Sequence, residues 1–254
     1  MKNQPIDYDR IADLYDAYVK ATYDVDFFVE EAQKAGGPVL ELMAGTGRLS
    51  IPLLEAGVRL TCVDLSPMML QKLRQKLDDR SLEAEIYEMD VRALSLPHTY
   101  QLILLPFNSF GELVSDEDQR HTLERIYSHL EAGGRFICTL HNPGLRRQRA
   151  DGVVRLWDKF PMGEGEGDLV LMGVETYNNE SGDVQGLQFY EHYDSQGVLQ
   201  SKRLLATNFN LLTRERFDEM ASAAGFTSQA LYGDYQRADF DVENSPYMIW
   251  VLEK

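Results

Sequence analysis

Short apolar segments alternate with amphipathic stretches through the first 141 residues of the chain, and this alternation limits the possible folds more than any other feature. The apolar segments are VLEL (39–42), RLTCVDL (59–65), EAEIYEMD (83–90), YQLILLPF (100–107) and RFICTLH (135–141). The stretches between them, such as SPMMLQKLRQKL and SDEDQRHTLERIYSHLEAGG, have helical periodicity. Strand–helix alternation of this kind predicts right-handed crossovers and a parallel sheet with helices on both faces.

Capping residues mark where several helices begin and end. Ser66 followed by Pro67 is typical of a helix start, and Thr213 predicts the start of a helix that ends before Gly225. Gly133–Gly134 predicts the end of the helix that precedes the fifth strand.

The two ends of the chain have different patterns. Residues 6–35 predict two helices. Between about 153 and 212 the periodicity changes to two, in LVLMGVETY, VQGLQFYEHY and VLQSKRLLATNFNLL, and the turn sequences NNESGD and DSQG separate these segments. This pattern predicts an antiparallel meander. The segments ALYGDY and YMIWVLEK follow as final strands.

The predicted fold is therefore a doubly wound, Rossmann-like, seven-stranded α/β sheet with an N-terminal helical lid and an antiparallel β insertion after strand 5. We expect a lid over residues 1–35, a ligand-binding core over 36–143, the insertion over 144–212 and the last helix and strands over 213–254. The 254 residues suit one large domain of this design.

Charge and cysteine usage exclude several classes of protein. Forty-one acidic and 25 basic side chains give a net charge of −16, which argues against a general nucleic-acid binder because phosphates attract a basic face. Cys62 and Cys138 lie inside apolar segments, so neither a disulfide framework nor a zinc cluster is expected. No secretory signal and no run of about 18 apolar residues is present, so we expect a cytoplasmic protein with no membrane partner.

The segment VLELMAGTGR (39–48) predicts a buried strand, a loop of small residues and a helix start near Arg48. Such a loop lets backbone N–H groups approach a ligand closely. A phosphate-binding loop of the G-x-x-x-x-G-K-[ST] type does not occur, and Met43 stands where a dinucleotide-binding loop has its first glycine. Asp64 and Asp90 end the second and third strands, so their carboxylates are expected at the ligand-binding edge of the sheet.

At this point the chain resembles the class I S-adenosylmethionine-dependent methyltransferases. The resemblance is carried by VLELMAGTGRLS, LTCVDLSPMMLQKLRQKL, EMDVRAL, LILLPFNSF and HLEAGGRFI, over roughly residues 36–141. The tail LTRERFDEMASAAGF and the leading YDRIADLYDAY are similar to small-molecule N-methyltransferases that act on amino sugars and glycine-like amines. Met43 departs from the usual glycine of the family.

The resemblance implies S-adenosyl-L-methionine as cofactor and assigns roles to individual residues. Asp64 would hold the ribose hydroxyls, Asp90 would accept from the adenine amino group, and Tyr15 would close over the methionine carboxylate. Tyr18 would face the methyl acceptor as a catalytic residue. The other implied cofactor-binding residues are Glu41, Ala44, Gly45, Gly47, Leu65, Met69, Val91, Pro106 and Phe107.

The residues near the acceptor leave alternatives open. His141 ends the fifth strand. It would serve either as a general base for methyl transfer or as a structural histidine that is hydrogen-bonded to the backbone at the strand end. The arginines at 146, 147 and 149 would anchor an acidic group of the acceptor or form a solvated surface. The tyrosines at 8, 15 and 18 have helical spacing, which also suits core packing.

We therefore expect a methyltransferase that acts on a small molecule, at an amine nitrogen rather than a hydroxyl, as a monomer or homodimer and without a metal. The Asn/Asp-Pro-Pro-aromatic motif of enzymes that methylate nucleobases or protein amides is replaced here by PFNSF. Two alternatives remain open: an enzyme that uses the same cofactor to cyclise its aminobutyrate chain, and a non-catalytic module that binds the cofactor.

Overall fold

A seven-stranded sheet forms the centre of the computed structural model, which describes residues 4–254. Its strands are β1 (Val39–Leu42), β2 (Leu60–Asp64), β3 (Glu85–Glu88), β4 (Tyr100–Leu105), β5 (Leu130–His141), β10 (Thr227–Tyr232) and β11 (Tyr247–Glu253). They are ordered β10-β11-β5-β4-β1-β2-β3. The first five strands pair in parallel, whereas β11 is antiparallel to both β5 and β10. The predicted doubly wound sheet of seven strands is confirmed.

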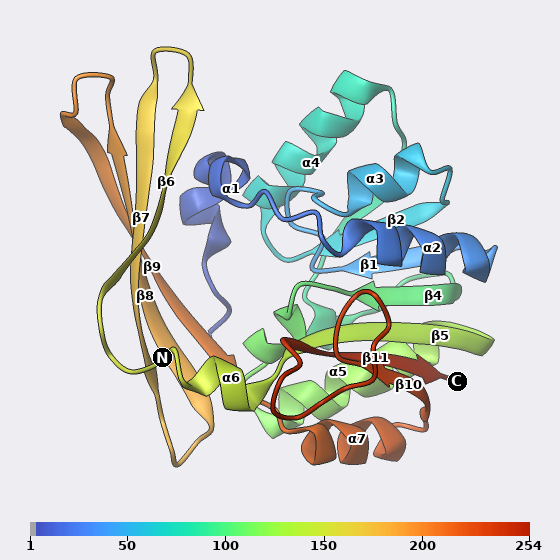
Figure 1. Ribbon diagram of the computed structural model, residues 1–254. Coiled ribbons are helices and arrows are strands. Elements are labelled where there is room, and N and C mark those ends of the chain that lie inside the picture. Colours follow the sequence, from blue (N-terminus) through green and yellow to red (C-terminus); the bar gives the residue numbers. More distant parts are fainter. Residues whose placement is uncertain (1–3) are drawn as a thin grey trace.

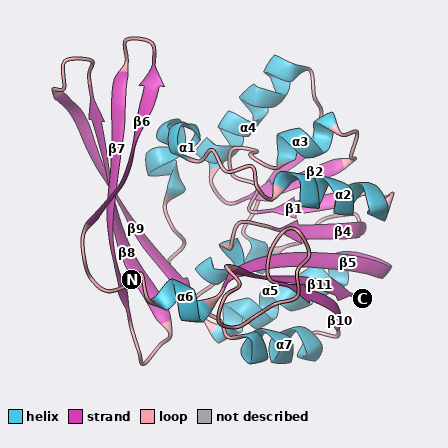
Figure 2. Cartoon of the chain, viewed as in Figure 1, coloured by secondary structure: helices cyan, strands magenta, loops and turns pink. Residues whose placement is uncertain are grey.

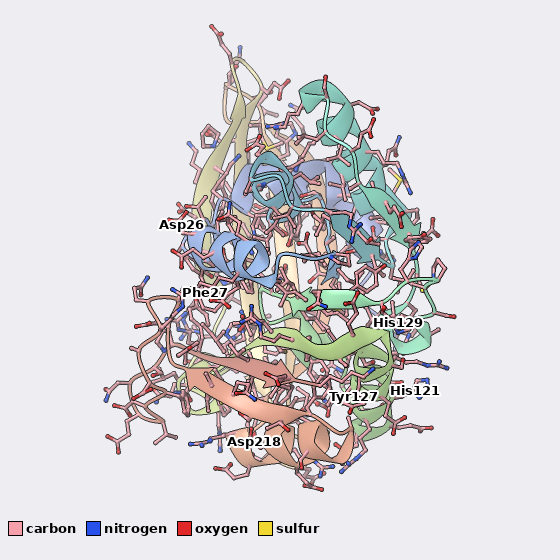
Figure 3. The ribbon with its side chains drawn as sticks, turned by 90° about the vertical axis from the view of Figure 1, so that its right-hand side faces the viewer. Asp26, Phe27, His121, Tyr127, His129 and Asp218 are labelled. Atoms are coloured by element: carbon pink, nitrogen blue, oxygen red, sulfur yellow. The ribbon has the colours of Figure 1, made fainter. Side chains whose placement is uncertain are left out.

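The helices of the structure lie on both faces of this sheet and at its carboxyl edge. They are α1 (Ala12–Tyr18), α2 (Val25–Ala35), α3 (Ser50–Glu55), α4 (Pro67–Arg80), α5 (Asp116–His129), α6 (Pro143–Arg147) and α7 (Arg214–Ala223), with 3-10 turns η1 (Tyr8–Ile11), η2 (Val91–Ala93) and η3 (Ser109–Glu112). Helices α2, α3 and α4 fill one face with Phe28, Leu53 and Leu73. Helices α5 and α7 fill the other with Ile126 and Phe217. Figure 3 shows α2 and α5 on opposite sides of the strands.

The capped helix starts predicted from the sequence are confirmed. Oγ of Ser66 accepts a hydrogen bond from the Met69 N–H over 3.1 Å, and Pro67 occupies the first turn of α4. Oγ1 of Thr213 accepts from the Arg216 N–H over 3.2 Å at the start of α7. Each cap satisfies one of the backbone donors that a helix leaves unpaired at its first turn.

The predicted helix end at Gly133–Gly134 is wrong. Helix α5 ends at His129, and both glycines belong to β5. A Cβ atom on Gly134 would lie 3.0 Å from the carbonyl oxygen of Tyr100, at the point where the pairing of β4 with β5 shifts register. Gly134 therefore allows close approach of two strands at an irregularity in the ladder, whereas Gly133 supplies a left-handed backbone at φ 72°.

A second, antiparallel sheet is inserted between β5 and α7. Its strands are β6 (Arg155–Gly163), β7 (Gly167–Tyr177), β8 (Asp183–Tyr193) and β9 (Leu199–Asn210), in that order. The sequence predicts the last three strands but not β6. That strand contains Pro161 and is exposed along most of its length, as is typical of an edge strand, so it lacks a clear alternation of apolar and polar residues.

The second sheet stands across the carboxyl edge of the first sheet, and α1 lies between the two (Figures 1 and 2). The N-terminal segment, residues 4–24, contains η1 and α1. Its residues Ile11 and Leu14 pack with Leu171, Tyr190 and other residues of the second sheet in one hydrophobic cluster. Arg203 of β9 forms an ion pair with Asp13 and donates to the Arg10 carbonyl. The N-terminal segment is thus held against the second sheet.

Cys62 and Cys138 are buried and free, as the sequence predicts. Within residues 4–254, none of the helices has both the length and the hydropathy that crossing a bilayer requires.

Candidate functional site

A cavity of about 550 Å³ is lined by residues at the carboxyl edge of the first sheet and by residues of the second sheet. Its walls come from the N-terminal segment, the loops after β1, β2 and β4, the end of β5, and strands β6 to β9. Ligands of doubly wound sheets bind at this edge. The predicted site residues that line it are Tyr15, Tyr18, Gly45, Asp64, Leu65, Met69, Phe107 and His141.

The loop after β1 is fixed against the end of β2. The backbone N–H of Gly45 donates to Oδ2 of Asp64 over 2.7 Å, and the Ser66 N–H donates to Oδ1 over 2.8 Å. Met43 and Gly45 have φ angles of 56° and 58°, so the loop turns through the left-handed region. Burial raises the pKa of Asp64, although the backbone donors favour its carboxylate form.

A narrow slot of about 50 Å³ adjoins this cavity, and the two share Met43, Leu65 and Glu112 among their lining residues. The slot is also lined by Met89, Asp90, Val91 and Leu113, most of them apolar. Asp90 is engaged by its neighbour, because the Arg92 guanidinium lies 2.5 Å from Oδ2 and the Arg92 N–H donates to Oδ1 over 2.9 Å. Burial opposes ionisation, but these contacts hold the pKa of Asp90 below its usual range.

Four tyrosines meet where the N-terminal segment reaches the second sheet. Tyr15 packs edge-on against Tyr8 and Tyr18, with ring centroids 6.1 and 5.4 Å away. The hydroxyl groups of Tyr18 and Tyr190 are 3.1 Å apart. Burial raises the pKa of Tyr15 and of Tyr18, so both phenols stay protonated at neutral pH. The Tyr18 hydroxyl is therefore a neutral hydrogen-bonding group.

Glu112 is a half-buried carboxyl group in the cavity wall that the sequence analysis missed. It belongs to η3, and Tyr8 donates to its Oε1 over 3.0 Å. Burial, together with the negative charge of Asp64, raises the pKa of Glu112 to about 7, against the effect of the Tyr8 hydrogen bond. A carboxyl group of this kind changes charge near neutral pH.

Three unpaired polar atoms belong to residues that line the cavity. Oδ1 of Asn108, Nη1 of Arg146 and Oγ1 of Thr207 are buried and have no hydrogen-bond partner within residues 4–254, and all three residues line the cavity. Buried polar groups are normally paired, so three such atoms around one cavity indicate where a polar ligand binds. Asn108 and Phe107 have φ angles of 66° and 60°, a strained backbone of the kind found at functional sites.

His141 stands beside these atoms and lines the same cavity. Burial, and then the charges of Arg146 and Arg149, lower the pKa of His141 to about 3, so its imidazole is neutral at physiological pH. Arg146 forms an ion pair of 2.5 Å with Glu175 and lies 4.9 Å from the centroid of the Phe209 ring. An imidazole with so low a pKa is a weak base.

Several predicted residues do not line the cavity. They are Glu41, Ala44, Gly47 and Pro106, which are at least half-buried in the wall behind it. Glu41 accepts from Oγ of Ser50 over 2.6 Å, and burial raises its pKa to about 7. Gly47, at φ 85°, is packed so closely that a Cβ atom would lie 2.4 Å from Cδ1 of Leu73.

The arginines at 146, 147 and 149 lie in three different environments. Arg146 lines the cavity, whereas Arg147 lies over the Tyr177 ring at 4.5 Å and donates to Asn179. Arg149 lines a neighbouring surface cavity that shares His141 and Arg146 with the first. Asn142 caps α6, and its side-chain N–H groups donate to the carbonyl groups of Val242 and Ser245, so its role is structural.

Several other residues that line the cavity were not predicted from the sequence. They are Asn108, Glu112, Glu175, Gln188 and Thr207. Asn108 immediately follows a strand-end motif, which is the one signal that could have found it. Within the described residues, no three His, Cys, Asp or Glu side chains are grouped as metal ligands would be.

Comparisons with known proteins agree with this architecture. The family described as "Methyltransferase domain" matches residues 39–134. A glycine/sarcosine N-methyltransferase from Halorhodospira halochloris is 34% identical over 254 residues, which cover 97% of this chain and 86% of that protein. A glycine/sarcosine N-methyltransferase from Parasynechococcus marenigrum is 27% identical over 97% of this chain and 82% of its own length.

A crystal structure shares the complete fold. It is that of an S-adenosylmethionine-dependent methyltransferase from Clostridium acetobutylicum, with a TM-score of 0.82 and 16% identity over 97% of this chain and 98% of that chain. The chain belongs to the class I S-adenosylmethionine-dependent methyltransferases. It is an enzyme that transfers a methyl group from S-adenosyl-L-methionine to a small-molecule acceptor.

Proposed function

We propose that the protein methylates the nitrogen of a small amine that carries a second polar group. The observation that carries this proposal is the unpaired, buried Oδ1 of Asn108 in the cavity wall. An amide oxygen accepts hydrogen bonds and so suits an N–H donor. The 34% identical relative is named for methylation of glycine and sarcosine, which are small amines with a carboxylate.

The residues of the cavity fit the cofactor. The Asp64 carboxylate accepts one backbone N–H at each oxygen, which leaves lone pairs for the ribose hydroxyls. The apolar slot beside Leu65 and Val91 suits a purine ring. Gly45 and Tyr15 line the neighbouring part of the cavity, where the methionine portion would lie. In this proposal the wall residues Glu41, Ala44, Gly47 and Pro106 act by shaping the loops.

Asp90 has a less direct role in this proposal. Its carboxylate is occupied by the Arg92 side chain and backbone N–H, so we assign Asp90 to fixing η2 beside the slot. Val91 then presents its apolar side chain to the adenine.

When bound, the cofactor supplies an electrophilic methyl group on a sulfonium, and the chain supplies alignment and exclusion of water. Asn108 Oδ1 accepts the amine N–H and directs the nitrogen lone pair away from itself. Tyr18 stays protonated and donates to the Tyr190 hydroxyl, which in turn donates to Oε1 of Gln188. The neutral imidazole of His141 donates no proton to the amine, which loses its ammonium proton to water before it binds and so enters the site in its nucleophilic form.

Glu112 takes up the proton that the methylated amine releases. With a pKa of about 7, its carboxylate is available at neutral pH and its conjugate acid is not too strong. Arg146 Nη1 and Thr207 Oγ1 bind the second polar group of the acceptor, because both atoms are buried without another partner. In this arrangement the N-terminal segment and the second sheet form the lid and the cap of the site.

The test is product analysis with a panel of amines. The enzyme is incubated with S-adenosyl-L-methionine and glycine, sarcosine, ethanolamine or an amino sugar, and S-adenosylhomocysteine is quantified by mass spectrometry. Asn108→Gly keeps the left-handed backbone and removes the amide, so KM for the accepted amine should rise at least tenfold while cofactor affinity changes less than threefold. Unchanged KM, or methylthioadenosine as the product, would contradict the proposal.

A further inference from the structure

A second cavity of about 730 Å³ adjoins the candidate functional site. Residues of β5, α6, β6 and β7 line it, and α6 connects β5 with the second sheet (Figure 1). Four residues line both cavities, namely His141, Arg146, Trp157 and Glu175. None of these four lines the apolar slot proposed for the adenine. The second cavity therefore continues the part of the site that is left for the acceptor.

The indole of Trp157 is positioned by an irregularity in β6. The pairing of β6 with β7 shifts register between Leu156 and Asp158, so Trp157 is the extra residue of a β-bulge. A Cβ atom on Gly173 of β7 would lie 2.3 Å from Cζ2 of Trp157, so glycine at this position leaves room for the indole. The Trp157 residue is 41% exposed and borders both cavities. It offers a flat apolar surface to a ligand that spans them.

The charged groups of the second cavity are mostly basic, although the whole chain has a net charge of −16. Three arginines and one acid line it: Arg146, Arg149, Arg155 and Glu175. Arg146 lies 2.5 Å from Glu175, and Arg155 lies 2.7 Å from Asp151. These two ion pairs cancel the charges of their members, so the net positive charge of the cavity comes from Arg149.

The Arg149 side chain is available to a ligand. Among residues 4–254, no ion pair and no side-chain hydrogen bond engages its guanidinium, and the residue is exposed. Its charge acts on the shared wall, because burial and then the charges of Arg146 and Arg149 lower the pKa of His141. A guanidinium binds the oxygens of a carboxylate or phosphate through paired N–H donors.

The wall of the second cavity also contains apolar side chains. Besides Trp157, they are Leu145, Val153, Pro246 and Tyr247. Apolar walls between a hydrogen-bonding end and a guanidinium suit a ligand with a hydrocarbon spacer. We infer that the acceptor is an amine with an anionic group at the far end of an apolar spacer. Its nitrogen lies in the first cavity, its spacer lies along Trp157, and its carboxylate or phosphate binds Arg149.

This acceptor differs from glycine, whose carboxylate is one carbon from its nitrogen and cannot span both cavities. The inference rests on the proposed function where it concerns the amine, because the nitrogen is the one that Asn108 would hold. The anion site at Arg149 does not depend on that proposal, and it is tested separately.

Quenching of tryptophan fluorescence by iodide tests the anion site without turnover. The chain has two tryptophans, and Trp250 is fully buried, so Trp157 is the indole that a quencher reaches. Iodide should quench the wild type about threefold more efficiently than Arg149→Gln, because the guanidinium concentrates anions near the indole. Uncharged acrylamide should quench both proteins equally, and inorganic phosphate should reduce the iodide quenching of the wild type.

The matched control for this measurement is Arg147→Gln. Arg147 lies over the Tyr177 ring at 4.5 Å and lines neither cavity. Iodide should quench this variant as it quenches the wild type. Circular dichroism melting verifies that both variants are folded.

Methyl transfer to amines of different length tests the substrate class. The acceptors are glycine, 6-aminohexanoate and 6-amino-1-hexanol, which has the same spacer without the anion. For the wild type, kcat/KM should be about tenfold higher with 6-aminohexanoate than with 6-amino-1-hexanol. Arg149→Gln should remove this difference, whereas Arg147→Gln should keep it. Adding 6-aminohexyl phosphate to the assay distinguishes phosphate from carboxylate, and a preference for either anion supports the inference.

Two results overturn the inference: equal iodide quenching of the wild type and Arg149→Gln, or equal kcat/KM of the wild type for 6-aminohexanoate and 6-amino-1-hexanol. If glycine is methylated and the longer amines are not, the proposed function holds and this inference fails. If no amine is methylated but the difference in iodide quenching is present, the proposed function fails, the acceptor assignment falls with it, and the anion site stands.

Discussion

The hydroxyl group of Tyr8 donates a hydrogen bond to Oε1 of Glu112 over 3.0 Å and so joins the N-terminal segment to the turn after β4. The two residues are 104 positions apart in the sequence. Through this contact the titratable Glu112 carboxyl group in the cavity wall is hydrogen-bonded to a protonated phenol. Burial and the neighbouring Glu112 raise the pKa of the Tyr8 phenol.

Cofactor binding should therefore depend on pH through Glu112. Its pKa is about 7 because burial and Asp64 disfavour the carboxylate, and a bound sulfonium favours it. Affinity for S-adenosyl-L-methionine should rise between pH 6 and 8, whereas affinity for S-adenosylhomocysteine, which lacks the sulfonium charge, should change little. Calorimetric titration of both ligands measures this difference. Glu112→Gln keeps the shape and should make the two pH profiles parallel; profiles like those of wild type would count against the assignment.

Asp64 should be needed for cofactor binding but not for folding. Asp64→Ala removes the acceptor of the Gly45 and Ser66 N–H groups as well as the group proposed for the ribose. We expect cofactor affinity to fall more than tenfold, since a charge-assisted hydrogen bond contributes about 1.5–3 kcal/mol. Asp78→Ala, on the exposed surface of α4, is the control. An affinity for Asp64→Ala within twofold of wild type would refute the assignment.

The sequence predicted the parts of the site that parallel strands bring to one edge. Asp64, Gly45 and His141 all follow or end strands, and the topology then places them around one cavity. The fold itself was predictable for the same reason, because the periodicities of the strands and helices reflect which faces are buried.

The rest of the site depends on contacts between distant segments, which no local pattern encodes. Nothing in the sequence near Glu112 distinguishes it from a surface acid, because its hydrogen-bond partner Tyr8 is distant in the chain. Thr207 is one of several polar residues of β9. Arg146 is paired with Glu175 only because α6 meets the second sheet. The same limit explains the wrong helix end at Gly133–Gly134, where a strand irregularity uses glycines as a helix terminus would.

The two glycines of the β1 loop should respond differently to alanine. Both have positive φ, but a Cβ atom at Gly45 meets nothing within 4 Å, whereas at Gly47 it meets Leu73 Cδ1 at 2.4 Å. Gly47→Ala should lower the free energy of unfolding by about 1–3 kcal/mol more than Gly45→Ala, because it adds overpacking to backbone strain. Gly45 lines the cavity, so Gly45→Ala should weaken cofactor binding more. Urea denaturation and calorimetry separate the two effects, and equal losses in both assays would disprove the distinction.

His141 should affect stability in acid but not the pH dependence of catalysis. Its pKa is lowered to about 3 by burial and by Arg146 and Arg149, so the folded state stays unprotonated while the unfolded state binds a proton near pH 6.5. This group therefore stabilises the fold above pH 6.5, and the contribution is lost as the pH falls.

The loss attributable to His141 between pH 7 and pH 5 should be about 2 kcal/mol, and His141→Gln should not show it. Urea denaturation at both pH values measures this difference. Between pH 6 and 9 the rate profile of His141→Gln should keep the inflections of the wild-type enzyme. An inflection that disappears with the histidine would restore the general-base interpretation.

The ion pair of Asp24 and Arg48 should be a strong determinant of stability. Asp24 is fully buried, Arg48 is 14% exposed, and the shorter N–O distance is 2.5 Å. The Arg48 guanidinium also lies 4.4 Å from the centroid of the Phe107 ring, which lines the cavity. Asp24→Asn leaves a buried cation without its counter-charge and should cost about 3–5 kcal/mol in unfolding free energy.

Asp26→Asn is the matched control for this pair, since Asp26 lies in the first turn of α2, two residues after Asp24, and is exposed (Figure 3). It should change the unfolding free energy by less than about 0.5 kcal/mol. Cofactor affinity should fall in Asp24→Asn because the Arg48 guanidinium, which lies over the Phe107 ring, loses the carboxylate that fixes its position. The double variant Asp24→Asn/Arg48→Met should recover part of the stability because no unpaired charge remains. If denaturation midpoints of the Asp24 and Asp26 variants coincided, the ion pair would have no special role in the stability of the fold.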